Sequence, residues 1–138
     1  MPIQRVLVGY DGAEHSERAL RFAVGINDDY ETEIHLAFVV NEPAGMADPI
    51  SEEVLDSLEK KGLDSLSNAE RFVRKQFRKP VTHLEIGNPV EKLLELADKL
   101  KPQLVVLGIA KHSSSESLIS TVSSRFLKSR RYPILLVP

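Results

Sequence analysis

Short apolar runs alternate with longer amphipathic stretches along the chain, and this pattern constrains the fold more than any other feature. Five runs have strand length: Ile3–Val8, Ile34–Val40, Val81–Ile86, Leu104–Leu107 and Ile134–Val137. Helical periodicity predicts a helix from about Ser16 and further helices over Ser51–Arg78, Pro89–Lys101 and Ser117–Ser129. Strands that alternate with helices indicate βαβ units. We therefore expect an α/β fold, a Rossmann-like, doubly wound sheet of five parallel strands with four helices.

Length and composition favour one folded domain spanning residues 1–138. Hydrophobic residues make up 42% of the chain and charged residues 28%, which excludes disordered and fibrous classes. The longest uncharged apolar stretch, Leu104–Ala110, is far shorter than the roughly 20 residues that cross a bilayer, so no membrane partner is expected. The absence of cysteine excludes disulfides and thiolate chemistry and fits a reducing compartment, so the cytoplasm is the expected location.

The net charge of −2 carries no signature of a nucleic-acid binder, and no nucleic-acid partner is expected. The charges are nevertheless unevenly placed. Residues 28–64 hold eleven acidic and two basic residues, whereas Arg71–Lys79 holds five basic residues and no acid. A solvated helix surface explains this pattern most simply, and an anionic partner for Arg71–Lys79 is the alternative.

Polar residues follow the first and fourth predicted strands. In a sheet ordered 3-2-1-4-5 these strands are neighbours, and ligands bind where the strand order reverses. The two loops would then bring together Asp11, His15, Lys111 and His112. A carboxylate suits ribose hydroxyls, a cation suits phosphate, and a helix N-terminus favours anions. The chemistry is that of a nucleotide site.

Each of these residues also has a structural interpretation. Asp11 can cap the first helix or shape the turn before it, and Ser113–Ser117 resemble an N-cap region. His15 and His112 could bind a metal with Asp11, but they lack a ligand spacing, and no metal is expected. The remaining histidines lie within predicted strands and are interpreted as packing or edge residues: His35 and His83.

Motifs of several enzyme classes are absent from the sequence. The seven glycines form neither a G-x-x-x-x-G-K-[ST] loop nor a G-x-G-x-x-G fingerprint, and neither H-E-x-x-H nor G-x-S-x-G occurs. Nothing supplies a nucleophile with a matching base. We therefore do not expect an enzyme.

Five blocks of the chain resemble, in order, those of the universal stress protein family: Arg5–Leu20, Gly87–Pro89, Leu104–Gly108, Ser120–Ser123 and Tyr132–Val137. The resemblance covers essentially the whole chain. It implies the strand order 3-2-1-4-5 and a homodimer in which the last strands, 134–137, pair antiparallel. An unpaired apolar edge strand invites association, so a second copy of the chain is also a physically sensible partner.

The resemblance also implies a set of nucleotide contacts. In ATP-binding members an aspartate after strand one contacts the nucleoside, backbone near the end of strand two holds the base, and a G-x-x-G-x9-G-[ST] segment wraps the ribose and phosphates. Asp11 matches the aspartate, Val39 the base-contacting position, Gly108 the first glycine and Thr121 the final hydroxyl.

Three departures from this motif matter. Lys111 replaces the second glycine, Ser120 replaces the third, and the interval between Gly108 and Ser120 is one residue short. A lysine side chain crowds the phosphate path, although its ammonium can partner a phosphate. A branch of the family that lacks these glycines does not bind ATP.

The resemblance thus predicts a stress-response regulatory or binding protein with a degenerate adenine-nucleotide pocket. No cofactor is certain, and ATP or another adenine nucleotide with Mg²⁺ is the candidate ligand. The alternative is an ATP-binding member with slow ATP hydrolysis or autophosphorylation at the hydroxyls between residues 113 and 124.

Overall fold

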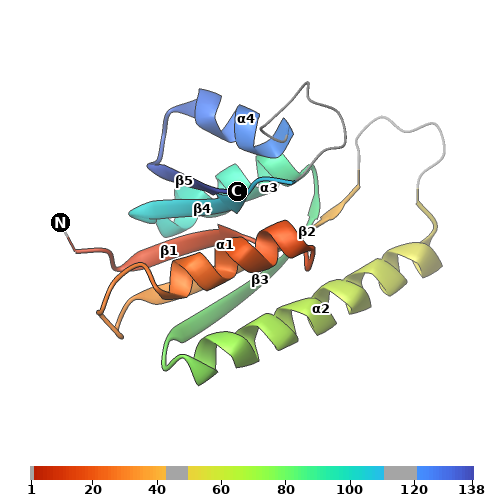
Figure 1. Cartoon of the computed structure of the whole chain (residues 1–138). Coiled ribbons are helices and arrows are strands. Elements are labelled where there is room, and N and C mark those ends of the chain that lie inside the picture. Colours follow the sequence, from red (N-terminus) through yellow and green to blue (C-terminus); the bar gives the residue numbers. More distant parts are fainter. Residues whose placement is uncertain (1, 43–49, 111–120) are drawn as a thin grey trace.

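Strands and helices alternate strictly along the chain, as the sequence predicts (Figure 1). The structure, a computed structural model, describes residues 2–42, 50–110 and 121–138. Its elements are β1 (Arg5–Gly9), α1 (Glu14–Val24), β2 (Glu33–Asn41), α2 (Glu52–Lys75), β3 (Lys79–Gly87), α3 (Pro89–Leu100), β4 (Leu104–Gly108), α4 (Thr121–Ser129) and β5 (Ile134–Val137). The strands are parallel in the order β3-β2-β1-β4-β5. The predicted fold class is confirmed, with strand ends shifted by one or two residues.

Helices cover both faces of the sheet and define two hydrophobic cores (Figure 1). Successive side chains of a strand point to opposite faces. In β1, Val6 and Val8 therefore join the core under α1 and α2, whereas Leu7 joins the core under α3 and α4. Burial on both faces explains why the central strands read as continuous apolar runs.

Helix α3 begins as the sequence predicts. The Asn88 side chain accepts hydrogen bonds from the backbone N–H groups of Val90 (3.0 Å) and Glu91 (3.1 Å), and Pro89 occupies the first turn. The helix ends at Leu100, one residue earlier than predicted, because Lys101 takes the left-handed conformation (φ +49°).

Helix α2 ends at Lys75 rather than at the predicted Arg78. Phe77 is left-handed (φ +58°), its N–H donates to the Arg74 carbonyl at 2.9 Å, and the Arg78 N–H donates to the Val73 carbonyl at 3.1 Å. These bonds form a Schellman motif, whose left-handed position is usually glycine. A Cβ at Gly62 would lie 2.9 Å from the Leu84 side chain, so glycine permits close packing of this helix on the sheet.

Strand β3 begins two residues earlier than predicted and includes Pro80. The Gly87 carbonyl accepts a hydrogen bond from the Glu42 N–H. The backbone N–H and C=O groups of odd-numbered β3 residues therefore point toward β2, and those of even-numbered residues point toward the outer edge of the sheet. Proline is tolerated there because it removes no ladder hydrogen bond. No helix among the described residues is long and apolar enough to cross a membrane.

Candidate functional site

The loop after β1 is shaped by Asp11. Its Oδ1 accepts a hydrogen bond from the Ala13 N–H at 2.9 Å, which makes an Asx turn. Helix α1 starts at Glu14, two residues earlier than predicted, and Ala13 is its N-cap. The interpretation of Asp11 as a helix cap is therefore wrong, and the turn interpretation is confirmed. The second carboxylate oxygen, Oδ2, lies 3.5 Å from His15 Nε2, and the Asp11 side chain is 56% exposed.

Gly108 lets α1 approach the end of β4 very closely. A Cβ at this position would lie 2.1 Å from the His15 carbonyl oxygen and 2.5 Å from its carbonyl carbon. Any other residue would force the first turn of α1 to move. The glycine thus has a packing reason that is independent of any phosphate. It also brings the loop after β1 to the end of β4, as the switch-point argument predicts.

The main chain of Val39 extends past the end of β1. Strand β1 ends at Gly9, opposite Ala37, whereas β2 continues to Asn41. The backbone N–H and C=O groups of odd-numbered β2 residues point toward β1: the Tyr10 N–H, for example, donates to the Ala37 carbonyl at 2.9 Å. The N–H and C=O of Val39 follow in this series, so they point into the space beyond β1.

A pocket of about 340 Å³ lies between these segments. Its apolar lining includes Ala37, Val39, Leu93, Leu107 and Val122. Its polar lining includes Asp11, His15, Ser16, Asn41 and Ser123. The pocket therefore combines walls that suit a flat, weakly polar group with a polar rim that suits hydroxyls or charge.

Four of the predicted site residues line this pocket together: Asp11, His15, Val39 and Gly108. Lys111 and Ser120 lie outside the described residues, as do His112 and Ser113–Ser117. Thr121 begins α4, and the next two residues line the pocket. The sequence reasoning missed Asn41, although strand alternation from Ala37 and Val39 places it on the same face.

Tyr10 lines the pocket but is not poised for proton transfer. Its hydroxyl donates to Glu17 Oε1, and burial, followed by that hydrogen bond, raises the pKa of Tyr10 well above its usual range. Besides Tyr10, the charged or titratable residues that line the described pocket are Asp11 and His15. Nor do the described residues bring three metal-ligating side chains together.

A sequence profile described as "Universal stress protein family" matches residues 2–138. A universal stress protein of Methanocaldococcus jannaschii is 24% identical over 138 residues, which cover 97% of this chain and 81% of that protein. Universal stress protein YxiE of Bacillus subtilis is 24% identical over 144 residues, covering 96% of this chain and 97% of that protein.

Solved structures share the fold along their full length. A universal stress family protein from Burkholderia pseudomallei has a TM-score of 0.80 at 22% identity, covering 99% of this chain and 96% of that one. A universal stress protein from Archaeoglobus fulgidus in complex with dAMP has a TM-score of 0.74 at 17% identity (coverage 99% and 98%). A universal stress protein in complex with cAMP has a TM-score of 0.68 at 21% identity (coverage 100% and 99%).

Proposed function

Because the chain belongs to the universal stress protein family, we propose that it is a regulatory protein that binds the adenosine part of an adenine nucleotide and does not turn it over. One observation carries this proposal: the Val39 main chain extends past β1 over an apolar pocket that has Asp11 at its rim. The cytoplasm is the proposed location, since the chain has no cysteine.

The Val39 main chain offers a donor beside an acceptor. Adenine presents an amino donor beside a ring-nitrogen acceptor on its pairing edge, which complements this pair, whereas guanine presents the opposite arrangement. The apolar walls cover the base, and the half-exposed Asp11 carboxylate can accept from ribose hydroxyls. The dAMP and cAMP complexes of structural relatives support the same ligand class.

The phosphates are proposed to add little affinity. Lys111 and Ser120 replace two glycines of the family motif, and Gly108 is required by its contact with the His15 backbone. The retained glycine is therefore no evidence for a phosphate loop. Adenosine, AMP and ATP with Mg²⁺ should bind within about tenfold of one another, a spread of about 1.4 kcal/mol.

Calorimetric titration tests this proposal, with Asp11→Asn as the variant. Asparagine keeps the Oδ1 acceptor for the Ala13 N–H but removes the charge, so the turn is preserved while the ribose contact weakens. Asp28→Asn, on an exposed residue outside the pocket, is the matched control. We expect saturable heat with adenosine and AMP that Asp11→Asn reduces and the control retains. Equal binding of guanosine and adenosine would refute the base assignment.

Absence of turnover is part of the proposal. It is supported by two hydroxyls of the pocket, because Tyr10 donates to Glu17 Oε1 and Ser16 donates to the Ala13 carbonyl at 2.9 Å. Incubation with ATP followed by mass spectrometry should reveal neither ADP nor a phosphorylated serine or threonine. Either product would favour the alternative of slow hydrolysis or autophosphorylation.

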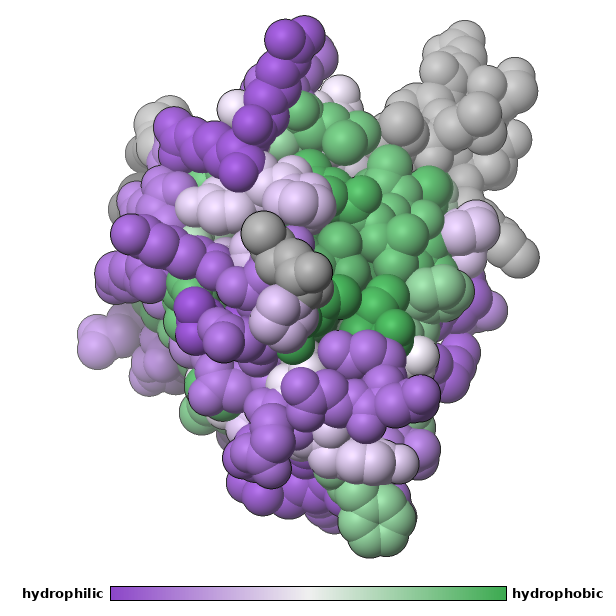
Figure 2. Space-filling view, turned by 90° about the vertical axis from the view of Figure 1, so that its left-hand side faces the viewer, coloured by the Kyte–Doolittle hydropathy of each residue, from purple (hydrophilic) through white to green (hydrophobic). Residues whose placement is uncertain are grey.

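The proposed partner is a second copy of the chain, bound through β5. This strand ends the sheet, and its residues Ile134–Leu136 are only partly buried. Figure 2 shows a continuous hydrophobic surface on the side of the molecule where the sheet ends at β5. Antiparallel pairing of two such edges would cover these side chains and satisfy the outer backbone groups.

A proline substitution tests this pairing selectively. Val105 and Ile109 donate to the Pro133 and Val137 carbonyls, so odd-numbered residues of β5 bond to β4 and the Leu136 N–H faces outward. Leu136→Pro thus removes an outer donor and leaves the β4 ladder in place. Light scattering should give the mass of two chains for the native protein and of one for the variant. A native protein that is still monomeric at about 100 µM would contradict the proposal.

A further inference from the structure

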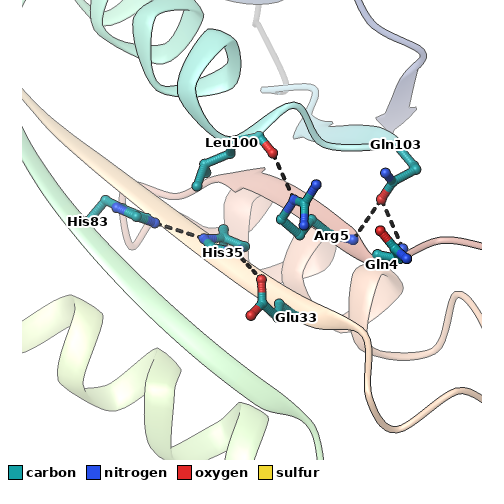
Figure 3. Close-up of polar contacts among 7 residues, drawn as sticks. All are labelled: Gln4, Arg5, Glu33, His35, His83, Leu100 and Gln103. Atoms are coloured by element: carbon teal, nitrogen blue, oxygen red, sulfur yellow. Dashed lines mark hydrogen bonds and ion pairs between the residues drawn. The ribbon is translucent and has the colours of Figure 1, made fainter.

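Two histidines 48 positions apart in sequence meet on the α3 face of the sheet (Figure 3). His35 Nδ1 lies 2.8 Å from His83 Nε2, and the rings stack at 17° with centroids 5.1 Å apart. His35 Nε2 lies 3.0 Å from Glu33 Oε1. His35 is 4% exposed, whereas His83 is only partly buried. This chain of contacts joins β2 to the edge strand β3 and is separate from the pocket residues.

The contacts determine which nitrogens carry hydrogen. A carboxylate accepts, so His35 Nε2–H must donate to Glu33, and His35 Nδ1 is then a bare acceptor. The hydrogen bond between the rings must therefore come from His83 Nε2–H. A first proton can enter at His83 Nδ1 without breaking either bond. A second proton, on His35 Nδ1, would set two N–H groups and two positive charges face to face.

The basic side chains nearest to the histidine pair are bonded to other groups. On this face, Glu33 is in register with Arg5 of β1 and Lys79 of β3. Arg5 Nε instead donates to the Leu100 carbonyl at 2.7 Å (Figure 3), and Lys79 pairs with Glu31.

Strand β3 and helix α3 bring further charges to this face. Strand β3 contributes Glu85, and α3 contributes Lys92, which pairs with Glu95 at 3.4 Å. Burial, followed by the charge of His35, lowers the pKa of His83, and Glu85 opposes this shift. Burial thus disfavours protonation of His83 although the Glu85 carboxylate stands nearby.

We propose that the His35–His83 pair is a proton-operated latch that holds the edge strand β3 on β2. One proton leaves the latch closed, and the second opens it. In the sheet register His83 stands opposite Ala37 and Glu85 opposite Val39, and both partners line the pocket. Opening of the latch therefore loosens the strand that supports the pocket floor, whether or not the pocket binds a nucleotide.

Hydrogen exchange of the β3 amides tests the latch. His83→Gln places an amide N–H donor near the position of Nε2. If His35 Nδ1 gains a proton, the amide can rotate so that its Oε1 accepts the new N–H, and the latch stays closed. His15→Gln, which removes an imidazole of α1 that lies beside Asp11, is the matched control. After correction for the intrinsic pH dependence, the exchange rates of the native β3 amides should rise roughly tenfold or more between pH 7 and pH 5. A tenfold change in an equilibrium constant corresponds to one pKa unit.

The variants decide the outcome. In His83→Gln the acceleration should fall below about twofold, and in His15→Gln it should match the native protein. A pH-independent native β3, or the same acceleration in His83→Gln, would overturn the latch. If His83→Gln does not fold, imidazole ¹⁵N NMR of the native chain decides instead. Two coupled titration steps support the latch, and independent single-step titrations of the two rings refute it.

Discussion

Replacing Gly108 with alanine tests the contact on which the geometry of the pocket depends. The added Cβ would lie 2.1 Å from the His15 carbonyl oxygen, whereas ordinary contacts begin at 3.4 Å. Backbone atoms cannot rotate away as a side-chain tip can, so the first turn of α1 must move by more than an ångström. Overpacking typically costs about 1–3 kcal/mol, and we expect the upper end of this range. For a chain of this length that corresponds to a fall in Tm of about 10 °C.

Thermal and urea denaturation followed by circular dichroism measures this cost. Gly25→Ala is the matched control, because the nearest atom to a Cβ at Gly25 lies at 3.8 Å and its φ of −99° suits any residue. We expect Gly25→Ala to remain within about 1 kcal/mol of the native protein. If Gly108→Ala proves as stable as Gly25→Ala, the account of the α1–β4 contact is wrong.

Three further perturbations follow from contacts outside the pocket. Phe77→Gly should raise the free energy of unfolding by about 0.5–1 kcal/mol in urea melts, because Phe77 is left-handed and 82% exposed; an unchanged or lower value would count against the strain. Arg78→Ala should cost about 3 kcal/mol by the same assay, since the buried guanidinium donates to the Asn27 carbonyl and to the Asp29 carbonyl at 2.5 Å; Arg78→Lys should not restore this loss. Stability should fall as the pH drops below about 6.5, because the lowered pKa of His83 in the folded state lets the unfolded chain bind more protons. Urea titrations between pH 8 and pH 5 should show this fall in the native protein and a smaller one in His83→Gln.

The sequence predicts the order of the elements because burial on both faces of a parallel sheet leaves uniformly apolar strands. It does not predict the end of α2, since Phe77 occupies a left-handed position at which glycine would be the usual signal. The approach of Asp11 to Gly108 could be predicted from topology, because the loops after adjacent strands meet where the strand order reverses, whereas Val39 is expected only from the family resemblance.

Other features depend on tertiary contacts that no local pattern encodes. The need for glycine at position 108 arises from the backbone of His15 in a different element. The His35–His83 contact depends on the relative register of β2 and β3. Sequence patterns place both histidines in strands, but only the register shows that their rings meet.

The response of the Val39 amide to nucleotides tests the central claim most directly. Its N–H points into the pocket beyond the end of β1, where the base is proposed to bind. In ¹H–¹⁵N NMR spectra, saturating AMP should shift the Val39 amide resonance strongly, as expected for a new hydrogen bond, and GMP should leave it nearly unchanged. A Val39 resonance that ignores AMP, or that responds equally to AMP and GMP, would contradict the account.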